Sequence, residues 1–329
     1  MPDNKHSSEQ QPSKFQQAIT GEWHGLPSVF DAKGSHTGFN KVNRASVFEG
    51  DKVTYWMETD FQNSGPLRNR FDTAGARFEF GVIDSDKDRI YCGPDFVGAG
   101  KPYGLLVDSN YYSPGWNTDL RTVNLILPEH GLQVYSSQLF EADTLVAVFN
   151  GLYVVTQDHA NNPAEQQKVA DFLVAERQAA IKPFILPVKE AGQWTGSFEV
   201  YDNKQQRLGE THIVIDYQPL NLRSAEVTVT MTGAIERSFH YKRSRVDAVH
   251  TFEGPDVFGN GRAYGRYLWS TQHFYGEAFK LKSRDTLIND KFDLCGVWQF
   301  YQSNDELYTC FGVLDWTPGA NVLSAKYIK

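Results

Sequence analysis

An internal duplication limits the fold of this chain more than any other feature of its sequence. Residues 93–104 read GPDFVGAGKPYG and residues 254–265 read GPDVFGNGRAYG, with seven of the twelve positions identical and an offset of 161 (254 − 93 = 161). A shorter pair, GEWHG at 21–25 and GQWTG at 192–196, recurs at an offset of 171 (192 − 21 = 171). Recurring blocks at such distances indicate a tandem copy of one structural unit. The chain is therefore predicted to hold two similar domains, with an insertion around residues 63–75 of the first.

Each copy is predicted to consist of short antiparallel strands. Apolar and polar residues alternate over many short stretches, such as 53–61, 120–127 and 235–242, with no helical periodicity between them. Aromatic residues make up 14% of the chain, and 27 glycines supply tight turns. A meander of this kind removes its exposed edges by closing into a barrel. The predicted fold is all-β, with two tandem antiparallel barrels.

One α-helix is predicted between the two barrels. Asn162 is a favoured helix cap, Pro163 suits the first helical position, and Glu165 completes a capping box. The predicted domain boundaries are a disordered N-terminus at 1–14, a first barrel at 15–160, a linker helix at 161–186 and a second barrel at 187–329.

Charge and cysteine content exclude several function classes. The chain has 32 basic and 40 acidic residues, and no stretch concentrates Lys and Arg as a nucleic-acid backbone requires. It has no apolar run of 18 residues, and its polar N-terminus lacks the apolar centre of a secretory signal, so we expect a cytoplasmic protein without a membrane partner. Cys92, Cys295 and Cys310 form no CxxC pair, and no metal or cofactor is expected.

The Gly-x-Trp blocks carry a family resemblance. Such a block at the start of an antiparallel meander, after a short helical turn at 15–20, resembles the lipocalin-like (calycin) proteins. In that family the Trp, here Trp23 and Trp194, plugs the closed end of the barrel. The two copies with their GPD and YG blocks are similar to an uncharacterised double-lipocalin family of cyanobacteria and plastids. A more distant resemblance is to lipocalin-like cyclases of the scytonemin type, which close a ring on an indole- and phenol-bearing β-keto acid. This resemblance implies a barrel pocket for a small hydrophobic or aromatic molecule.

His250 is the leading candidate for chemistry in the second copy. Alternation along residues 246–252 places it on the same face as Phe252, so it is either a hydrogen-bonded core residue or a general acid/base in a cavity. The same alternation places four more side chains on inward faces, where the arginines would bind a carboxylate and the tyrosines would donate hydrogen bonds: Arg237, Tyr264, Arg266 and Tyr301. In the alternative, Arg237 and Arg266 lie on the outer face or close a barrel end.

The strand at 53–61 provides the candidates of the first copy. Tyr55, Met57 and Phe61 share one face, and Trp56, Glu58 and Asp60 share the other. If the apolar face points inward, the two carboxylates are solvated. If the faces are reversed, Glu58 and Asp60 lie beside Trp56 in a pocket, where desolvation raises the pKa of a carboxyl toward use as a general acid. In that case Arg68 and Arg70 would anchor an anionic substrate. Independently of these faces, Tyr111 and Trp116 belong to an aromatic loop after a later strand, which forms either a substrate-binding lid over a barrel mouth or a surface patch at the domain contact.

The remaining motifs narrow the reaction class. The repeated Gly, Pro and Asp residues are interpreted as turn-forming, and no GxSxG, Ser-x-x-Lys or dinucleotide fingerprint occurs. Three functions stay open. The one we favour is a cofactor-independent cyclase or isomerase that acts on a small aromatic substrate by acid/base catalysis. The others are a non-catalytic carrier of a hydrophobic or pigment ligand and a bilin-type chromophore lyase.

Overall fold

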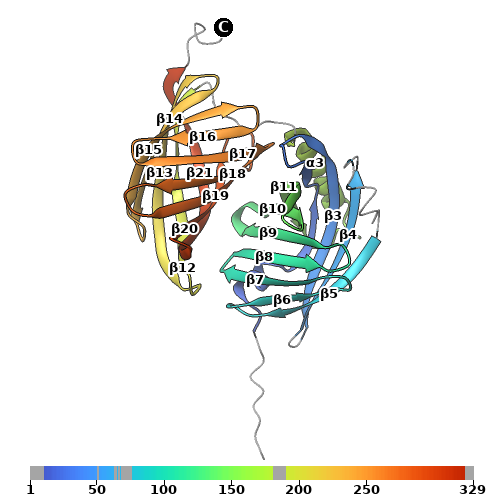
Figure 1. Ribbon diagram of the computed structural model, residues 1–329. Coiled ribbons are helices and arrows are strands. Elements are labelled where there is room, and N and C mark those ends of the chain that lie inside the picture. Colours follow the sequence, from blue (N-terminus) through green and yellow to red (C-terminus); the bar gives the residue numbers. More distant parts are fainter. Residues whose placement is uncertain are drawn as a thin grey trace, which may run out of the picture. The chain divides into compact units, whose positions relative to one another are not determined.

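The computed structural model describes residues 11–49, 52–62, 76–180 and 190–322, together with Gly65 and Leu67. The chain divides into two compact units (Figure 1). The first contains the residues up to Val29 and then Thr37–Glu176; the second contains Phe30–His36 and the chain from Arg177 onward. The predicted insertion at 63–75 and residues 1–10 lie almost entirely outside the described residues.

The first unit is a closed antiparallel barrel. Its strands follow one another in chain order, and β1 (Gly21–Gly25) closes the ring by pairing with both β11 (Thr144–Thr156) and β3 (His36–Glu49). Strand β2 (Ser28–Phe30) also pairs with β11 and β3, so β1 and β2 occupy one strand position, interrupted where Pro27 removes a backbone donor. The intervening elements are β4 (Lys52–Gln62), β5 (Ala76–Asp84), β6 (Arg89–Cys92), β7 (Val97–Tyr103), β8 (Leu106–Ser113), β9 (Thr118–Leu127), the 3-10 turn η1 (Pro128–His130) and β10 (Leu132–Glu141).

A short helix, α1 (Lys14–Ile19), packs into the core of the first barrel. The Ser13 hydroxyl caps it by accepting a hydrogen bond from the backbone N–H of Gln16 at 3.0 Å. Phe15 and Ile19 are buried in the same apolar cluster as Trp23. The Trp23 indole N–H donates to the carbonyl of Ile19 at 2.9 Å, which fixes the start of β1 against the helix.

A buried ion pair joins α1 to the strands of this barrel. The Arg89 guanidinium has no exposed surface and donates to the Asp84 carboxylate, to the Tyr55 hydroxyl at 3.0 Å and to Gln16 Oε1 at 3.1 Å. The backbone N–H and the hydroxyl of Ser13 both donate to Asp84 at 2.8 Å. A buried charge is tolerated when it is paired and hydrogen-bonded in this way.

The second unit is a closed barrel of ten antiparallel strands, in which β12 pairs with β21. Trp194 repeats the role of Trp23: it is buried, and its indole N–H donates to the carbonyl of Phe292 at 2.7 Å. The strands are β12 (Glu190–Asp202), β13 (Arg207–Asn221), β14 (Ser224–Gly233), β15 (Arg237–Val246), β16 (Val249–Glu253), β17 (Val257–Tyr264), β18 (Tyr267–Phe274), β19 (Phe279–Leu287), β20 (Leu294–Gln302) and β21 (Asp305–Val322).

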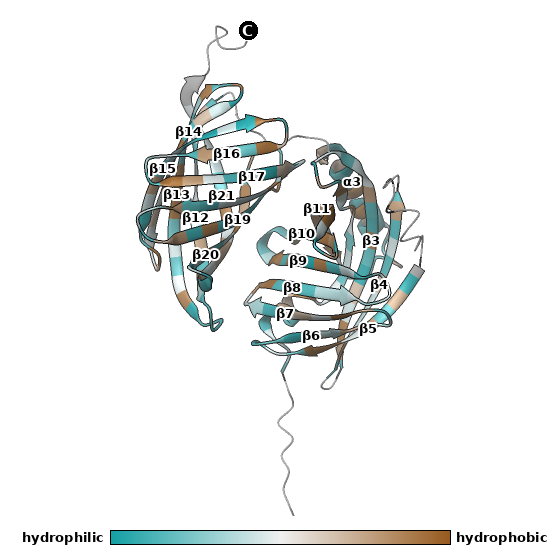
Figure 2. Ribbon diagram, viewed as in Figure 1, coloured by the Kyte–Doolittle hydropathy of each residue, from teal (hydrophilic) through white to brown (hydrophobic). Residues whose placement is uncertain are grey.

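Alternating side chains build each barrel core. On β13, Ile213, Ile215 and Tyr217 point inward and are buried, whereas His212 lies on the outer face of the strand and is exposed. Figure 2 shows the same alternation of apolar and polar residues along many strands. The prediction of two tandem antiparallel β-barrels is confirmed.

The predicted helix between the barrels is also present. Helix α3 (Pro163–Ala179) begins at the expected proline, and the Asn162 side chain accepts from the N–H of Ala164 at 3.0 Å. The buried Glu176 carboxylate accepts from the N–H of Leu152 in β11 at 3.0 Å. None of the helices in the described ranges is long and apolar enough to span a membrane.

The repeated GPD blocks form equivalent hairpins. The N–H of Gly93 donates to the carbonyl of Phe96 at 3.0 Å, and the N–H of Gly254 donates to the carbonyl of Val257 at 2.8 Å. Gly104 and Gly265 turn the chain at the end of each block with φ values of 62° and 61°, where a side chain would be strained. These positions shape the fold in both copies, as the sequence indicates.

Candidate functional site

A pocket of about 280 Å³ lies in the second unit, at the end of the barrel where β15 turns into β16. The segment Phe30–His36 and Ala180, next to the end of α3, supply part of its wall, and both belong to the second unit. Ten residues line the pocket: Phe30, Gly34, His36, Ala180, Arg245, Asp247, Ala248, His250, Ala263 and Gly265.

The segment at 30–36 is held in place by backbone and side-chain contacts. Arg262 donates to the carbonyl of Lys33 at 2.7 Å. The Asp31 carboxylate accepts from the N–H groups of Lys33 and Ser35 at 2.9 and 2.8 Å, which closes a tight turn. Gly34 has a φ of 92°, and a Cβ atom there would lie 2.8 Å from the Ala248 side chain. The turn therefore lies against the β15–β16 hairpin only because position 34 is a glycine.

The hairpin itself brings the polar residues together. Asp247 and Ala248 form a two-residue turn, with Asp247 in the left-handed region at a φ of 52°. The strands on either side place Arg245 directly opposite His250. A cation, a carboxylate and an imidazole thus gather at one end of the barrel.

His250 forms the floor of the pocket. Its side chain has no exposed surface, and Nδ1 accepts a hydrogen bond from Nε of Arg243 at 3.5 Å. Burial, and then the positive charges of Arg243 and Arg245, lower the pKa of His250 to about 2. The imidazole is therefore neutral, with its proton on Nε2. The sequence prediction that His250 faces inward with Phe252 agrees with this position, since both side chains are buried.

Arg245 is the basic group in the pocket wall. Its side chain is partly buried, and within the described part of the chain it forms no ion pair with a carboxylate. Apolar surface from Phe30 and Ala263 lies around it. A charged group beside an apolar wall is the usual arrangement for binding a small molecule that has an apolar body and one charged end.

The interior of the second barrel is almost filled. A cavity of about 40 Å³ remains among the core side chains, room for about one water molecule. The partly buried Asp285 lines this cavity and accepts from the Trp298 indole at 2.8 Å and from the Ser283 hydroxyl at 3.0 Å. Burial raises the pKa of Asp285 and lowers that of Arg243, which lines the same cavity. This space is too small for a ligand of the size that the sequence suggests.

In the first unit, β4 turns its apolar face inward. Tyr55 and Met57 pack in the barrel core, so Trp56, Glu58 and Asp60 occupy the opposite face of the strand. The Arg77 guanidinium lies over the Trp56 ring, 4.4 Å from its centroid. Asp60 accepts from the Gln62 side chain at 3.0 Å. This orientation is the alternative in which the apolar face points inward. Glu58 and Asp60 are partly buried, and no contact tests their predicted catalytic role.

The other residues predicted for the first unit are dispersed. Tyr111 packs against Tyr91 with ring centroids 4.8 Å apart, and burial raises its pKa well above the ordinary value. Trp116, in the turn between β8 and β9, is 40% exposed. Arg68 and Arg70 lie outside the described residues. The substrate-binding roles of these four residues stay predictions.

The second unit brings together only part of the predicted set. Tyr264 and Arg266 are buried on either side of Gly265 in the pocket wall. Arg237 begins β15 at the far end of that strand from Arg245, over the Phe279 ring and paired with Glu277 at 2.5 Å. The Nζ atoms of Lys280 and Lys282 lie 5.1 and 4.8 Å from the centroid of the Tyr301 ring. Arg237 and Tyr301 therefore lie away from the pocket that His250 lines.

Sequence reasoning missed three polar residues of the pocket: His36, Arg245 and Asp247. For Arg245 and Asp247 a signal existed, because a two-residue hairpin before His250 places them at the same barrel end. No pattern in residues 30–36 indicates that they belong to the second unit. Sequence reasoning also missed the grouping of Glu22, His24 and His159, whose donor atoms lie within 4.8 Å of one another.

Comparisons with known proteins support the fold and leave the function open. No family model matches the chain, and neither does any curated protein. A DUF3598 protein of unknown function from Nostoc punctiforme is similar in structure, with a TM-score of 0.58, 10% identity and coverage of 93% of this chain and 99% of that one. A putative outer membrane protein from Bacteroides fragilis, with a TM-score of 0.23, 9% identity and coverage of 92% and 99%, is too dissimilar to support an argument. The comparison with the first protein supports a double β-barrel.

Proposed function

We propose that the second unit binds a small aromatic molecule bearing a carboxylate, in the pocket lined by Phe30, Arg245 and His250. The observation that carries this proposal is Arg245, a cation beside the apolar part of the pocket wall. It forms an ion pair with no carboxylate of the described chain, including Asp247 in the same pocket. A carboxylate ligand would supply the missing negative charge.

The size and walls of the pocket narrow the ligand further. Its volume of about 280 Å³ lies just below the range of roughly 300 to 1,000 Å³ typical of drug-sized ligands, so one or two aromatic rings would fill it. Phe30 contributes an aromatic wall, and its ring meets that of His36 edge to face at 5.2 Å. The neutral His250 at the floor suits a hydrogen-bonding role better than proton transfer, because a pKa of about 2 is far from neutral pH.

Two probes that differ only in charge test this proposal. Indole-3-acetate should bind the full chain in isothermal titration, and the uncharged indole-3-acetamide should bind about 10- to 100-fold more weakly. Arg245→Gln should weaken acetate binding by a similar factor. Arg237→Gln, on the same strand at the other barrel end, is the matched control and should leave binding unchanged. Equal binding of both probes, or equal effects of both variants, would overturn the proposal.

Acid/base catalysis on the bound molecule, as in a cyclase of the scytonemin type or an isomerase, is the second candidate. His36 and Asp247 favour it, because both line the same pocket and neither is fully buried. The assay incubates the protein with an indole- and phenol-bearing β-keto acid and detects ring closure by mass spectrometry. His36→Ala and Asp247→Asn should lower the rate, whereas His273→Ala, an exposed histidine of β18, should not. Absence of ring closure in the wild type would exclude this reaction.

Two further observations on the purified protein distinguish the remaining candidate functions. Loss of turnover in Glu58→Ala would instead support the predicted site on β4 of the first unit. Visible absorbance of the purified protein would support a pigment carrier or a bilin-type lyase.

A further inference from the structure

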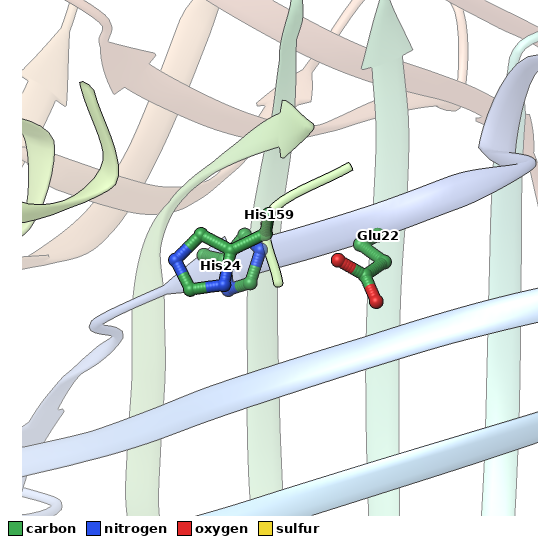
Figure 3. Close-up of side chains that lie close together, drawn as sticks. All are labelled: Glu22, His24 and His159. Atoms are coloured by element: carbon green, nitrogen blue, oxygen red, sulfur yellow. The ribbon is translucent and has the colours of Figure 1, made fainter. Parts of the chain in front are cut away.

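Three potential metal ligands meet on the first unit, apart from the pocket of the second unit. Glu22 and His24 lie on β1, and His159 lies in the loop between β11 and α3 (Figure 3). One donor atom of each side chain lies within 4.8 Å of the donor atoms of the other two. The imidazole rings of His24 and His159 have centroids 4.3 Å apart and planes at 39°.

The contacts of His24 leave its Nε2 atom available as a metal ligand. Nδ1 lies 3.0 Å from Asn43 Oδ1, an oxygen that can only accept, so the neutral ring carries its proton on Nδ1 and a lone pair on Nε2. Nε2 lies 3.0 Å from the Thr156 hydroxyl, and that hydroxyl has a second acceptor in the carbonyl of Glu22 at 3.4 Å. A metal ion can therefore take the lone pair of Nε2 while Thr156 keeps a hydrogen bond. An acceptor that fixes the protonated nitrogen is the usual outer contact of a metal-bound histidine.

The loop that carries His159 is braced by the start of α3. The Glu165 carboxylate accepts from the backbone N–H groups of Gln157 and Asp158, both at 2.9 Å. The Gln166 side chain donates to the carbonyl of His159 itself at 3.0 Å. Glu22 and His159 are both only partly buried, so an ion can reach them from solvent. Hydrogen bonds thus hold the backbone before His159 and at His159 itself.

We propose that Glu22, His24 and His159 bind a divalent transition-metal ion of the Zn²⁺ class. Two imidazoles and one carboxylate suit Zn²⁺, and Cu²⁺ and Ni²⁺ favour the same nitrogen donors. Donors about 2.0–2.1 Å from a tetrahedral ion are about 3.3–3.4 Å apart, so separations of up to 4.8 Å have to shorten by up to about 1.4 Å. Three protein ligands leave a fourth position for water or for a ligand from solution.

The test uses the full chain stripped with chelator and a Cys92→Ser background, because the exposed Cys92 thiol is a competing soft ligand. Zn²⁺ titrated in competition with a chromogenic chelator should bind with one-to-one stoichiometry. His159→Ala and Glu22→Gln should each weaken binding at least tenfold, and both sites are only partly buried, so the fold should persist. His130→Ala, an exposed histidine of η1, is the matched control and should bind as the parent does.

Two further measurements separate a metal site from a merely structural cluster. Bound Co²⁺ should give the visible absorption of a low-coordinate nitrogen and oxygen site, and His159→Ala should abolish it. Asn43→Ala should weaken Zn²⁺ binding about 10-fold through the lost orientation of His24. Absence of saturable Zn²⁺ binding, or equal affinities of His159→Ala and His130→Ala, would overturn the proposal.

Discussion

The Nε atom of Arg243 donates a hydrogen bond to Nδ1 of His250, 3.5 Å away, at the boundary between the filled barrel interior and the pocket. A guanidinium as donor holds the imidazole in its neutral form. His250 therefore serves as a fixed polar floor, and Arg245 on the opposite strand position supplies the charge that a ligand would meet.

The lowered pKa of His250 predicts a pH dependence of stability. Because the pKa is about 2 in the folded chain and about 6.5 for a free imidazole, the unfolded chain alone takes up this proton as the pH falls below about 6.5. Stability should therefore fall with decreasing pH, by up to about 1.4 kcal/mol per pH unit between roughly pH 6 and pH 3. His250→Gln should remove this part of the slope in urea unfolding curves at several pH values. Identical slopes for the variant and the wild type would contradict the prediction.

Gly34→Ala should detach the turn at 31–35 from the β15–β16 hairpin. A Cβ atom at this position would lie 2.8 Å from the Ala248 side chain and 3.0 Å from the carbonyl of Ala263, and the φ of 92° adds strain of about 1–3 kcal/mol. Trypsin should then cleave after the exposed Lys33 faster than in the wild type. Gly276→Ala is the control, since a Cβ atom there meets nothing within 4 Å. Equal cleavage rates in both variants would show that the turn does not depend on this glycine.

Breaking the buried pair of Arg89 and Asp84 should destabilise the first unit strongly. Asp84→Asn leaves a guanidinium with no exposed surface beside a neutral amide, which should cost about 3–5 kcal/mol in the free energy of unfolding. Arg121→Met removes an exposed arginine that lies over the Phe140 ring and should change stability by less than about 1 kcal/mol. Chemical denaturation followed by tryptophan fluorescence measures both, and similar losses would contradict the expected role of the pair.

Thiol reactivity should distinguish the three cysteines. Cys92 is exposed, whereas Cys295 and Cys310 are buried, and burial raises the pKa of both buried thiols well above their ordinary value. Ellman's reagent should label Cys92 quickly in the folded chain and all three thiols after denaturation. Rapid labelling of Cys295 or Cys310 in the native protein would show that the second barrel opens.

Local patterns predicted the parts of this fold that depend on neighbouring residues. Alternation placed His250 on an inward face and grouped Tyr55 with Met57 on one face of their strand, and the capping sequence placed the start of α3 at Pro163. Which face of the strand at 53–61 points inward stayed open until the structure showed Tyr55 in the core. Pairings between segments far apart in the sequence produce no pattern in either segment from which they could be predicted. His24 and His159 meet because β1 closes the barrel against β11, and the periodicity of either segment is the same whether or not they pair. The same holds for Arg245, because residues 30–36, far from it in sequence, supply part of the wall of its pocket.

Because residues 30–36 belong to the second unit, neither copy of the duplication is complete without the other. A chain cut in the linker would leave the second copy without one wall of its pocket and the first copy with a turn that has no surface to cover. The two copies are therefore not interchangeable modules, because a short segment of the first copy is part of the second unit. A deletion that returned the chain to one copy would therefore also remove part of the wall of the pocket that Arg245 and His250 line.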